Sequence, residues 1–482
     1  MKPDTVDHLR TQPMAANDLS IAYIGGGSRQ WAPTLIQDLA LAPYSGEVRL
    51  FDANLPAARK NARFGNWVQD TKETRGQWDY AAVEDIESAL DGADIVVMST
   101  QYDPRETFVH DLMIPKQFGI YGAVSATIGP GGIMRALRTI PVYREFADQV
   151  RTHCPNAWVF NFTNPVHFVT RALYDEFPDI KALGLCHEVS GTRSHLASIA
   201  ERELGVSATR EDIEVNVKGI NHFTWIDEAR YRGHDLWPIL EDVADLKEAR
   251  QQFSTEEMAD ESPFVDHWQV TWELFRRFGL LPAAGDRHLV EYANSFLQGG
   301  RAGLNRWGVK RTDSAYRAKH WTPAASDQTT DVEAWLAGDQ DLELNSSRET
   351  FTEILAGLVG DDPYVTNVNL PNVGQVTGLE SDTIVETNAL VRTDSVSPLS
   401  AGSFPRPVRS MVGTHIDTIE TVIDASRSGD LDRAFQGFLI DPQVRSLTPE
   451  DSATLFAELV DSQVDYLDDW DLTGSTVLSE TE

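Results

Sequence analysis

The feature that most constrains the fold is a short apolar run that ends in a glycine turn and leads into apolar residues at helical spacing. Residues 19–24 form the run, Gly25, Gly26, Gly27 and Ser28 form the turn, and a periodic segment follows at 35–39. This order predicts a strand, a tight turn and a helix. Further apolar runs alternate with helical segments at 48–51, 94–98, 158–162 and 182–185. We therefore predict an α/β fold built on a doubly wound parallel sheet.

The alternation of strands and helices divides the chain into three parts. Residues 1–18 are polar and lack periodicity, which predicts a flexible extension. Residues 19–210 carry the alternating pattern and are expected to form a Rossmann-like domain, a fold that binds dinucleotides. Residues 211–482 contain predicted helices at 264–278 and 410–426 and one predicted strand at 383–391. Because 482 residues exceed one compact core, we expect this part to form a C-terminal α+β substrate domain packed on the sheet.

The charge balance indicates the compartment and excludes some partners. The formal net charge is −33, and only 9 of the 41 basic residues are lysine. Such an excess of carboxylates repels nucleic acid, and it repels itself unless salt of about 1 M shortens the Debye length to about 3 Å. No apolar stretch suits a membrane helix or a signal core. We therefore expect a cytoplasmic protein that is adapted to high salt and has no nucleic-acid or membrane partner. The alternative to adaptation to salt is an ordinary acidic protein.

The glycine turn and the second strand together predict a dinucleotide site. Gly25 and Gly27 match the first two glycines of a G-x-G-x-x-G turn, although Gln30 stands where the third would be. Asp52 ends the second predicted strand, where a carboxylate binds both ribose hydroxyls and disfavours a 2′-phosphate. We therefore predict NAD as the cofactor and assign to its site Gly25, Gly26, Gly27, Ser28, Asp52 and Thr100. The alternative is a tight turn with a purely structural role.

Two side chains on predicted strand-end loops have the chemistry of metal ligands. Cys186 follows the run at 182–185, and His222 lies in Gly219-Ile220-Asn221-His222-Phe223. A thiolate and an imidazole bind divalent transition metals and leave positions open for substrate oxygens. Taken alone, Cys186 also fits a buried small hydrophobe, and His222 also fits a hydrogen-bonded core histidine.

The motifs taken together resemble glycoside hydrolase family 4, the NAD- and manganese-dependent glycosidases, from about residue 19 to about residue 470. The segments that carry the resemblance follow the glycine turn in the family's order, at 114–132, 136–141, 164–166, 186–187, 219–222 and 369–374. The resemblance implies that Cys186 and His222 hold Mn²⁺ or another divalent metal. It also implies that Asn164 holds sugar hydroxyls near C2 and C3, and that the protein is a homo-oligomer.

The resemblance further implies a mechanism outside the two-carboxylate scheme of most glycosidases. NAD takes a hydride from C3, a base removes the C2 proton, the C1 substituent is eliminated, water adds, and NADH restores the C3 hydroxyl. The metal acts as a Lewis acid. We assign the base to Asp286, which also fits a structural turn, and protonation of the leaving group to His187, which also fits a hydrogen bond to the sugar. The loop at 123–128 lacks the Gln-Glu-Thr sequence common in the family and has no catalytic carboxylate.

The residues after the metal cysteine indicate the sugar. Cys186-His187-Glu188-Val189 resembles the α-galacturonidase branch of the family, and Glu188 at the sugar site would repel a phosphate. A uronate needs a cation, for which Arg287 and Arg301 are candidates, although both also fit surface arginines. We predict cleavage of short α-galacturonides, with α-galactosides or α-glucosides as the alternative. Two other functions remain open: an NAD-dependent hydroxy-acid or sugar dehydrogenase, and a non-catalytic NAD-binding protein.

Overall fold

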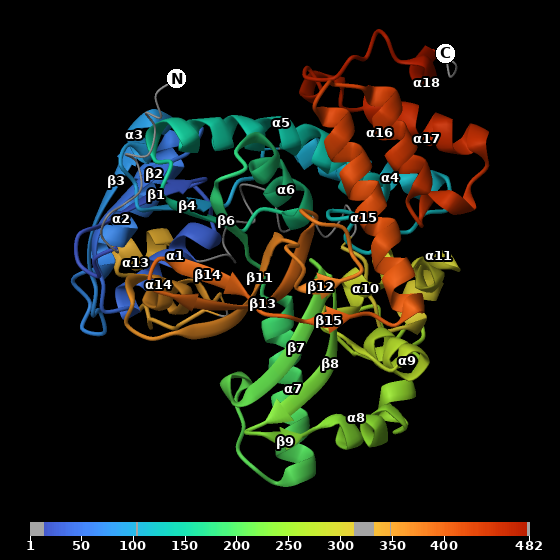
Figure 1. Ribbon diagram of the computed structural model, residues 1–482, viewed down its shortest axis with the longest axis horizontal. Helices are drawn as coiled ribbons and strands as arrows, with labels where there is room; N and C mark the ends of the chain where they lie inside the picture. Colours follow the sequence, from blue (N-terminus) through green and yellow to red (C-terminus); the bar gives the residue numbers. More distant parts are fainter. Residues whose placement is uncertain (1–13, 103–104, 313–331, 348, 480–482) are drawn as a thin grey trace, which may run out of the picture.

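The computed structural model describes residues 14–102, 105–312, 332–347 and 349–479 (Figure 1). Of the predicted extension at 1–18, residues 1–13 lie outside the described part, and Met14 is buried in a hydrophobic core that also contains Leu19 and Ile21. None of the described helices combines the length and the apolar character that a membrane-spanning helix needs.

A nine-stranded sheet forms the centre of the molecule, and six of its strands are parallel. Their order is β3-β2-β1-β4-β5-β6, so the chain changes direction between β1 and β4. Such a switch point opens a crevice at the carboxyl ends of the strands. The bounds of these strands are β1 Leu19–Ile24, β2 Ser45–Phe51, β3 Gln77–Val83, β4 Ile95–Met98, β5 Trp158–Asn161 and β6 Lys181–Gly184.

Both faces of this sheet are covered, because successive side chains of a strand point to opposite sides. In β1, Ala22 and Ile24 belong to one core, and Ile21 and Tyr23 belong to the other. The first core is covered by α3 Ile86–Leu90, α5 Gly129–His153, α6 Val166–Glu176 and α15 Arg406–Ser426. The second core is covered by α1 Trp31–Leu41, α2 Leu55–Val68, α13 Val332–Ala337 and α14 Phe351–Val359.

The second half of the chain contributes three antiparallel strands to the same sheet. Beyond β6 the order continues β11-β13-β14, and Asn369 of β11 pairs with Gly184 of β6. These strands, orange in Figure 1, are β11 Tyr364–Pro371, β13 Ile384–Arg392 and β14 Ser395–Pro398. The two halves of the chain therefore share one sheet.

A smaller sheet with its helices lies below the first in Figure 1. Its strands are β7 Ile213–Ile220, β8 Phe223–Tyr231, β9 His234–Asp235 and β10 Leu281–Pro282. The helices nearby in the chain are α7 Glu188–Leu204, α8 Trp237–Ala244, α9 Gln269–Phe278, α10 Asp286–Tyr292 and α11 Gly300–Arg306. The remaining elements are α4 Arg105–Gln117, β12 Val376–Thr377, β15 Gly402–Ser403, α16 Leu431–Ile440, α17 Pro449–Asp461 and α18 Thr476–Ser479.

The predicted fold class, a doubly wound parallel sheet with a C-terminal α+β part, is confirmed, with two differences in detail. The helix predicted from residue 264 begins only at Gln269, because Trp268 has a φ of +58° and its N–H donates to Asp266 Oδ1 in a turn. The strand predicted at 383–391 exists as β13, but it extends the first sheet rather than a separate layer. The division at residues 210 and 211 remains a proposal.

Candidate active site

The glycine turn lies at the carboxyl end of β1, beside the switch point. The N–H groups of Gly25 and Gly26 both donate to Phe51 O at 2.9 Å. Gly25 has a φ of +92°, and a Cβ there would lie 2.1 Å from Ser99 O, so only glycine fits. The first amide of α1, on Trp31, donates to Ser28 Oγ. A backbone open to close approach at a helix N-terminus suits a pyrophosphate.

Asp52 lies against this turn. Its Oδ2 accepts from Gly27 N at 2.9 Å, and its Oδ1 accepts from Asn54 N at 2.8 Å. A Cβ on Gly27 would lie 2.7 Å from Asp52 Cγ, so glycine allows this approach. Asn61 of α2 donates to both Gly26 O and Ser28 O, at 2.8 and 2.9 Å. The residues thus fit the diphosphate and ribose of a dinucleotide, and Asn61 is a supporting residue that sequence reasoning missed.

Two predicted residues follow the neighbouring strands β4 and β5. Thr100 N donates to Thr163 Oγ1 at 2.8 Å, and Thr100 Oγ1 lies 3.2 Å from Tyr143 OH. Asn164 Oδ1 is buried and has no hydrogen-bond partner among the described residues. A buried amide oxygen normally has a partner, so a ligand hydroxyl would satisfy it.

Cys186 and His222, which are 36 residues apart, meet at the end of β6. Cys186 Sγ lies 3.2 Å from His222 Nε2. His222 occupies the two-residue turn between β7 and β8, has a φ of +62° and is 3% exposed. The hairpin tip therefore carries the imidazole to the thiol, and the structure brings the two predicted ligands together.

The electrostatics of this pair fit a divalent metal. Burial, together with His288, lowers the pKa of His222 well below its usual value, so the ring is neutral and can ligate a metal. Burial, then Glu386 and Glu188, raises the pKa of the Cys186 thiol well above its usual value. A bound cation reverses the second effect, because a coordinating thiol loses its proton. Imidazole and thiolate donors suit Zn²⁺ and similar transition-metal ions, and Mn²⁺ bound here would take its other ligands from oxygen donors such as sugar hydroxyls or water.

His288 and Glu188 complete a cluster around His222. The rings of His222 and His288 stack with centroids 3.8 Å apart, and His288 Nε2 lies 3.6 Å from Glu188 Oε1. Glu188 Oε2 accepts from Gly285 N at 2.6 Å. In the structure Glu188 contacts His288 and Gly285, and its predicted contact with the substrate remains a proposal. Sequence reasoning missed His288 as part of the site, although a histidine shortly after the predicted base Asp286 was a visible signal.

His187 lies between the metal ligands and the dinucleotide turn. Its Nδ1 is 3.0 Å from Glu349 Oε1, its ring packs on Trp31 of α1, and its side chain is 46% exposed. A partly exposed imidazole beside a carboxylate can deliver a proton.

Asp286 is buried at the start of α10 and faces the N-terminus of α9. Its Oδ1 accepts from Thr271 N and Thr271 Oγ1, both at 2.9 Å, and its Oδ2 accepts from Val270 N at 3.0 Å. Burial raises the pKa of Asp286 to about 6 despite these donors. The carboxylate therefore caps α9, and the hydrogen bond recorded for Oδ2 is the one from Val270 N. Asp266, which sequence reasoning missed, accepts from Asp286 N at 3.0 Å.

A second carboxylate that was missed lies behind the metal ligands. Glu386 of β13 is 1% exposed, and burial raises its pKa to about 7. Asn221 Nδ2 donates to Glu386 Oε2 at 3.3 Å, and Asn367 Nδ2 donates to Oε1 at 2.7 Å. Because Asn221 precedes His222, Glu386 helps to hold the hairpin tip.

The two predicted arginines are placed differently. Arg287 is partly buried, donates to Pro263 O at 3.0 Å and lies over the ring of Phe264. Arg301 is exposed on α11. Neither has a recorded contact with Cys186 or His222, so their assignment to the substrate remains a proposal.

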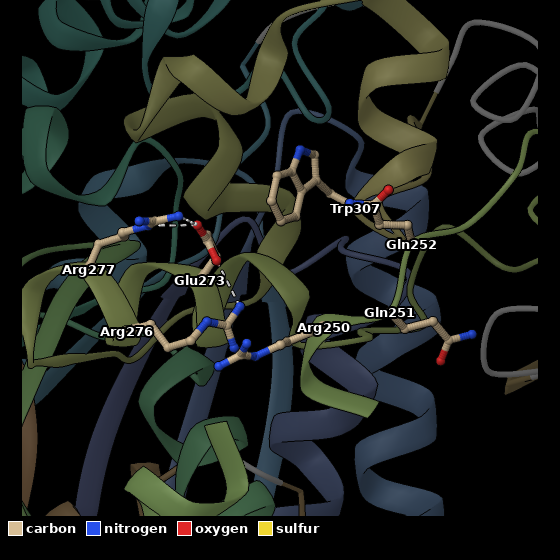
Figure 2. Close-up of a pocket in the computed structure, with 7 residues that line it drawn as sticks. All are labelled: Arg250, Gln251, Gln252, Glu273, Arg276, Arg277 and Trp307. Atoms are coloured by element: carbon tan, nitrogen blue, oxygen red, sulfur yellow. Dashed lines mark hydrogen bonds and ion pairs between the residues drawn. The ribbon is translucent and has the colours of Figure 1, made fainter. Parts of the chain in front are cut away.

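A cavity of about 320 Å³ lies elsewhere, between α9 and the segment before it, and none of the predicted site residues lines it. Figure 2 shows Glu273 between Arg276 and Arg277, with Trp307 above them. Glu273 pairs with both arginines at 2.8 Å, and Arg250 pairs with Asp245. The cations of this cavity thus have partners within the chain.

Comparison with known proteins agrees with this geometry. Residues 20–202 match the model of the family 4 glycosyl hydrolases, and residues 217–444 match that of their C-terminal domain. An α-galacturonidase from Thermoanaerobacter italicus is 39% identical over 457 residues, which cover 94% of this chain and 98% of the relative.

Solved structures show the same fold. The crystal structure of LplD from Bacillus subtilis is 39% identical, with a TM-score of 0.84, and covers 92% of this chain and 100% of that chain. A 6-phospho-α-glucosidase from gut microorganisms, solved with NAD and Mn²⁺, has a TM-score of 0.76 over 94% of this chain and 99% of its own. At 17% identity the latter likeness shows the fold alone. The family resemblance of the sequence motifs is confirmed, and the chain belongs to family 4 of the glycosyl hydrolases.

Proposed function

We propose that this chain is an α-galacturonidase that depends on NAD and on a divalent metal. The observation that carries the proposal is the approach of Cys186 Sγ to His222 Nε2, 3.2 Å apart, on the sheet edge that also carries the glycine turn. The relative named α-galacturonidase, at 39% identity over nearly the whole length of both chains, supports the substrate class. The sequence Cys186-His187-Glu188-Val189 supports it independently.

The residues fit both cofactors. NAD would lie on the turn from Gly25 to Ser28, with its ribose on Asp52, and Cys186 and His222 would hold the metal. When bound, NAD supplies reversible hydride acceptance and the metal supplies Lewis acidity. The presence of NAD and Mn²⁺ in the solved 6-phospho-α-glucosidase of similar fold supports this proposal.

Three side chains are proposed to handle the sugar. Asn164 Oδ1, buried without a partner among the described residues, accepts from a hydroxyl near C2 or C3. Asp286 removes the C2 proton through Oδ2, and a pKa of about 6 leaves it ionised at neutral pH yet basic enough to act. His187 protonates the leaving oxygen, since its ring is partly exposed and held by Glu349.

Recognition of the uronate carboxylate is proposed to fall to Arg287, with Arg301 as the second candidate. Arg287 follows Asp286 directly, and its partly buried guanidinium can bind a carboxylate bidentately. A cation would offset the repulsion between a uronate carboxylate and the carboxylates of Glu188 and Asp286.

The test is turnover of a short α-galacturonide in deuterated water, followed by NMR of the released sugar. Removal of the C2 proton and its return from solvent must place deuterium at C2, whereas direct displacement cannot. The neutral α-galactoside with the same aglycone is the matched substrate. Product without deuterium would overturn the elimination mechanism, and preference for the neutral substrate would overturn the uronide assignment. Accumulation of bulk NADH would indicate a dehydrogenase.

We also propose that the protein works as a homo-oligomer in a salt-rich cytoplasm. The net charge of −33 supports the salt requirement, because close carboxylates need screening. The proposed division into an NAD-binding part at 19–210 and a substrate part at 211–482 is supported by the sequence pattern. Light scattering and activity measured against salt concentration test the oligomer and the salt requirement.

A further inference from the structure

The cavity of about 320 Å³ at the C-terminal end of α9, which we call the arginine cavity, lies apart from the proposed active site. Its lining includes three arginines and a tryptophan: Arg250, Arg276, Arg277 and Trp307 (Figure 2). Asp286 of the proposed active site caps the other end of this helix by accepting from Thr271 N. Because an α-helix rises about 1.5 Å per residue, Arg277 lies about 9 Å further along it than Thr271. The arginine cavity is therefore a separate place on the molecule.

The arginines of this cavity outnumber the carboxylates that pair with them. Arg276 and Arg277 share Glu273, and each pair measures 2.8 Å. Arg250 pairs with Asp245. Three guanidinium groups thus have two carboxylates among their recorded ion pairs, which leaves one positive charge in excess. In a chain with a net charge of −33, a local excess of positive charge attracts anions that the rest of the surface repels.

Two of the guanidinium groups are accessible, and the third is fixed in place. The side chains of Arg250 and Arg277 are 52% and 71% exposed. Exposed ion pairs contribute little to stability, so a ligand can take the place of their partners. Arg276 is 17% exposed, and its Nη1 donates to Ala244 O at 2.7 Å and to Ala249 O at 3.2 Å. These carbonyl oxygens hold the group without cancelling its charge, so it loses little entropy when it binds a ligand.

Trp307 gives the cavity an apolar wall. Its ring packs edge-on against that of Phe296, with centroids 4.8 Å apart and planes at 79°, which fixes its orientation. The residue is only partly buried, and an indole face next to water suits the apolar face of a sugar ring. Gln251 and Gln252 also line the cavity and are exposed, and their amides can donate to and accept from hydroxyl groups. An inorganic anion would use the arginines but not the ring.

We propose that the arginine cavity is a second, non-catalytic binding site for an acidic sugar of one ring. The sugar carboxylate binds the guanidinium groups, which match it bidentately, and the sugar ring lies against Trp307. The volume of about 320 Å³ is at the lower end of the range of about 300–1,000 Å³ for small-molecule pockets, which fits a monosaccharide rather than a chain. The inference goes beyond the proposed function, and only the choice of galacturonate as the probe rests on it.

The test is calorimetric titration of the full-length protein, loaded with NAD and Mn²⁺, with galacturonate. Arg250→Gln combined with Arg277→Gln should remove one binding event or weaken it about tenfold or more, because charge-assisted hydrogen bonds are lost. The matched control is Arg202→Gln combined with Arg230→Gln, since these arginines are 55% and 42% exposed and each pairs with a glutamate outside the cavity. The control should give the isotherm of the unmodified protein. The same isotherm from the cavity double variant would overturn the proposal.

Two further ligands identify what the cavity recognises. Galactose lacks the carboxylate and inorganic phosphate lacks the ring, so each should bind the cavity about tenfold or more weakly than galacturonate does. Binding to the cavity is the difference between the unmodified protein and the cavity double variant. Galactose bound as tightly as galacturonate would overturn the role of the arginines. Phosphate bound as tightly would overturn the assignment to a sugar.

Failure of the proposed function gives a different result from failure of this inference. If the proposed active site does not bind galacturonate, its binding event is missing from every isotherm. The event of the cavity is still present then, and it still disappears in the cavity double variant. That variant should also cleave a short α-galacturonide with the kcat/KM of the unmodified protein, because it leaves the proposed active site intact. A loss of kcat/KM would overturn the assignment of the cavity as non-catalytic.

Discussion

Asp52→Asn should weaken NAD binding and reduce the preference for NAD over NADP. Asp52 lies at the end of β2 and touches the glycine turn through Gly27 N at 2.9 Å, which places its carboxylate where the ribose of a bound NAD would lie. The substitution keeps the size of the side chain and one acceptor oxygen, but removes the charge. We expect the loss of at least one charge-assisted hydrogen bond, which contributes about 1.5–3 kcal/mol. This corresponds to roughly 10- to 150-fold in the dissociation constant.

Calorimetric titration with NAD and with NADP measures both effects. NADP should lose less affinity than NAD, because the carboxylate that repels its 2′-phosphate is gone. Glu47→Gln is the control, since Glu47 is an exposed carboxylate on the same strand, with Ser20 and Arg49 as partners. If Asp52→Asn bound NAD as tightly as Glu47→Gln does and kept the same ratio of NAD to NADP affinity, the assignment of the ribose site would be wrong.

Four further predictions concern stability and catalysis. Arg138→Leu leaves the buried Asp111 without its 2.8 Å ion pair, so urea unfolding should show a loss of about 3–5 kcal/mol, most of it recovered when Asp111→Leu is added. Burial raises the pKa of Asp441 to about 7, above about 3.9 in the unfolded chain, so its contribution to stability falls as pH rises between these values. In urea titrations Asp441→Asn should therefore gain stability relative to the unmodified protein from about pH 4 to about pH 7 and change little above that. Asp286→Asn should lower kcat about 10²-fold or more while NAD affinity is kept, and a kcat within twofold would remove Asp286 as the base. Melting temperature and activity should rise together up to about 1 M salt, and full values of both in dilute buffer would refute adaptation to salt.

The sequence predicted the parts of the molecule that depend on neighbouring residues. The run at 19–24, the glycines after it and the periodic residues at 35–39 specify a strand, a turn and a helix within one short window, so β1 and α1 were foreseen. Cys186 and His222 were found because their residue types bind metals and because each follows or joins a strand. Their approach to 3.2 Å then required that both loops lie at the same edge of the sheet.

Other features depended on contacts between distant segments. The strand β13 was predicted, but its place in the sheet was not. It lies next to β11, and β11 in turn pairs with the edge of β6 through Asn369 and Gly184. Sequence patterns give the period of a strand and not the edge that it will pair with, since pairing is decided by what the whole chain buries.

The surroundings of the metal ligands were likewise decided by tertiary structure. Glu188 is predicted to contact substrate from its motif, and its contacts with His288 and Gly285, about 100 residues further along the chain, came only from the structure. Asp286, predicted as a base from its motif, also caps α9 with both carboxylate oxygens. Motif chemistry identifies which side chains can react, because reactivity belongs to the residue type. Which groups surround them is fixed only when the β7–β8 hairpin, α10 and β13 pack together, and no local signal in the sequence encodes that packing.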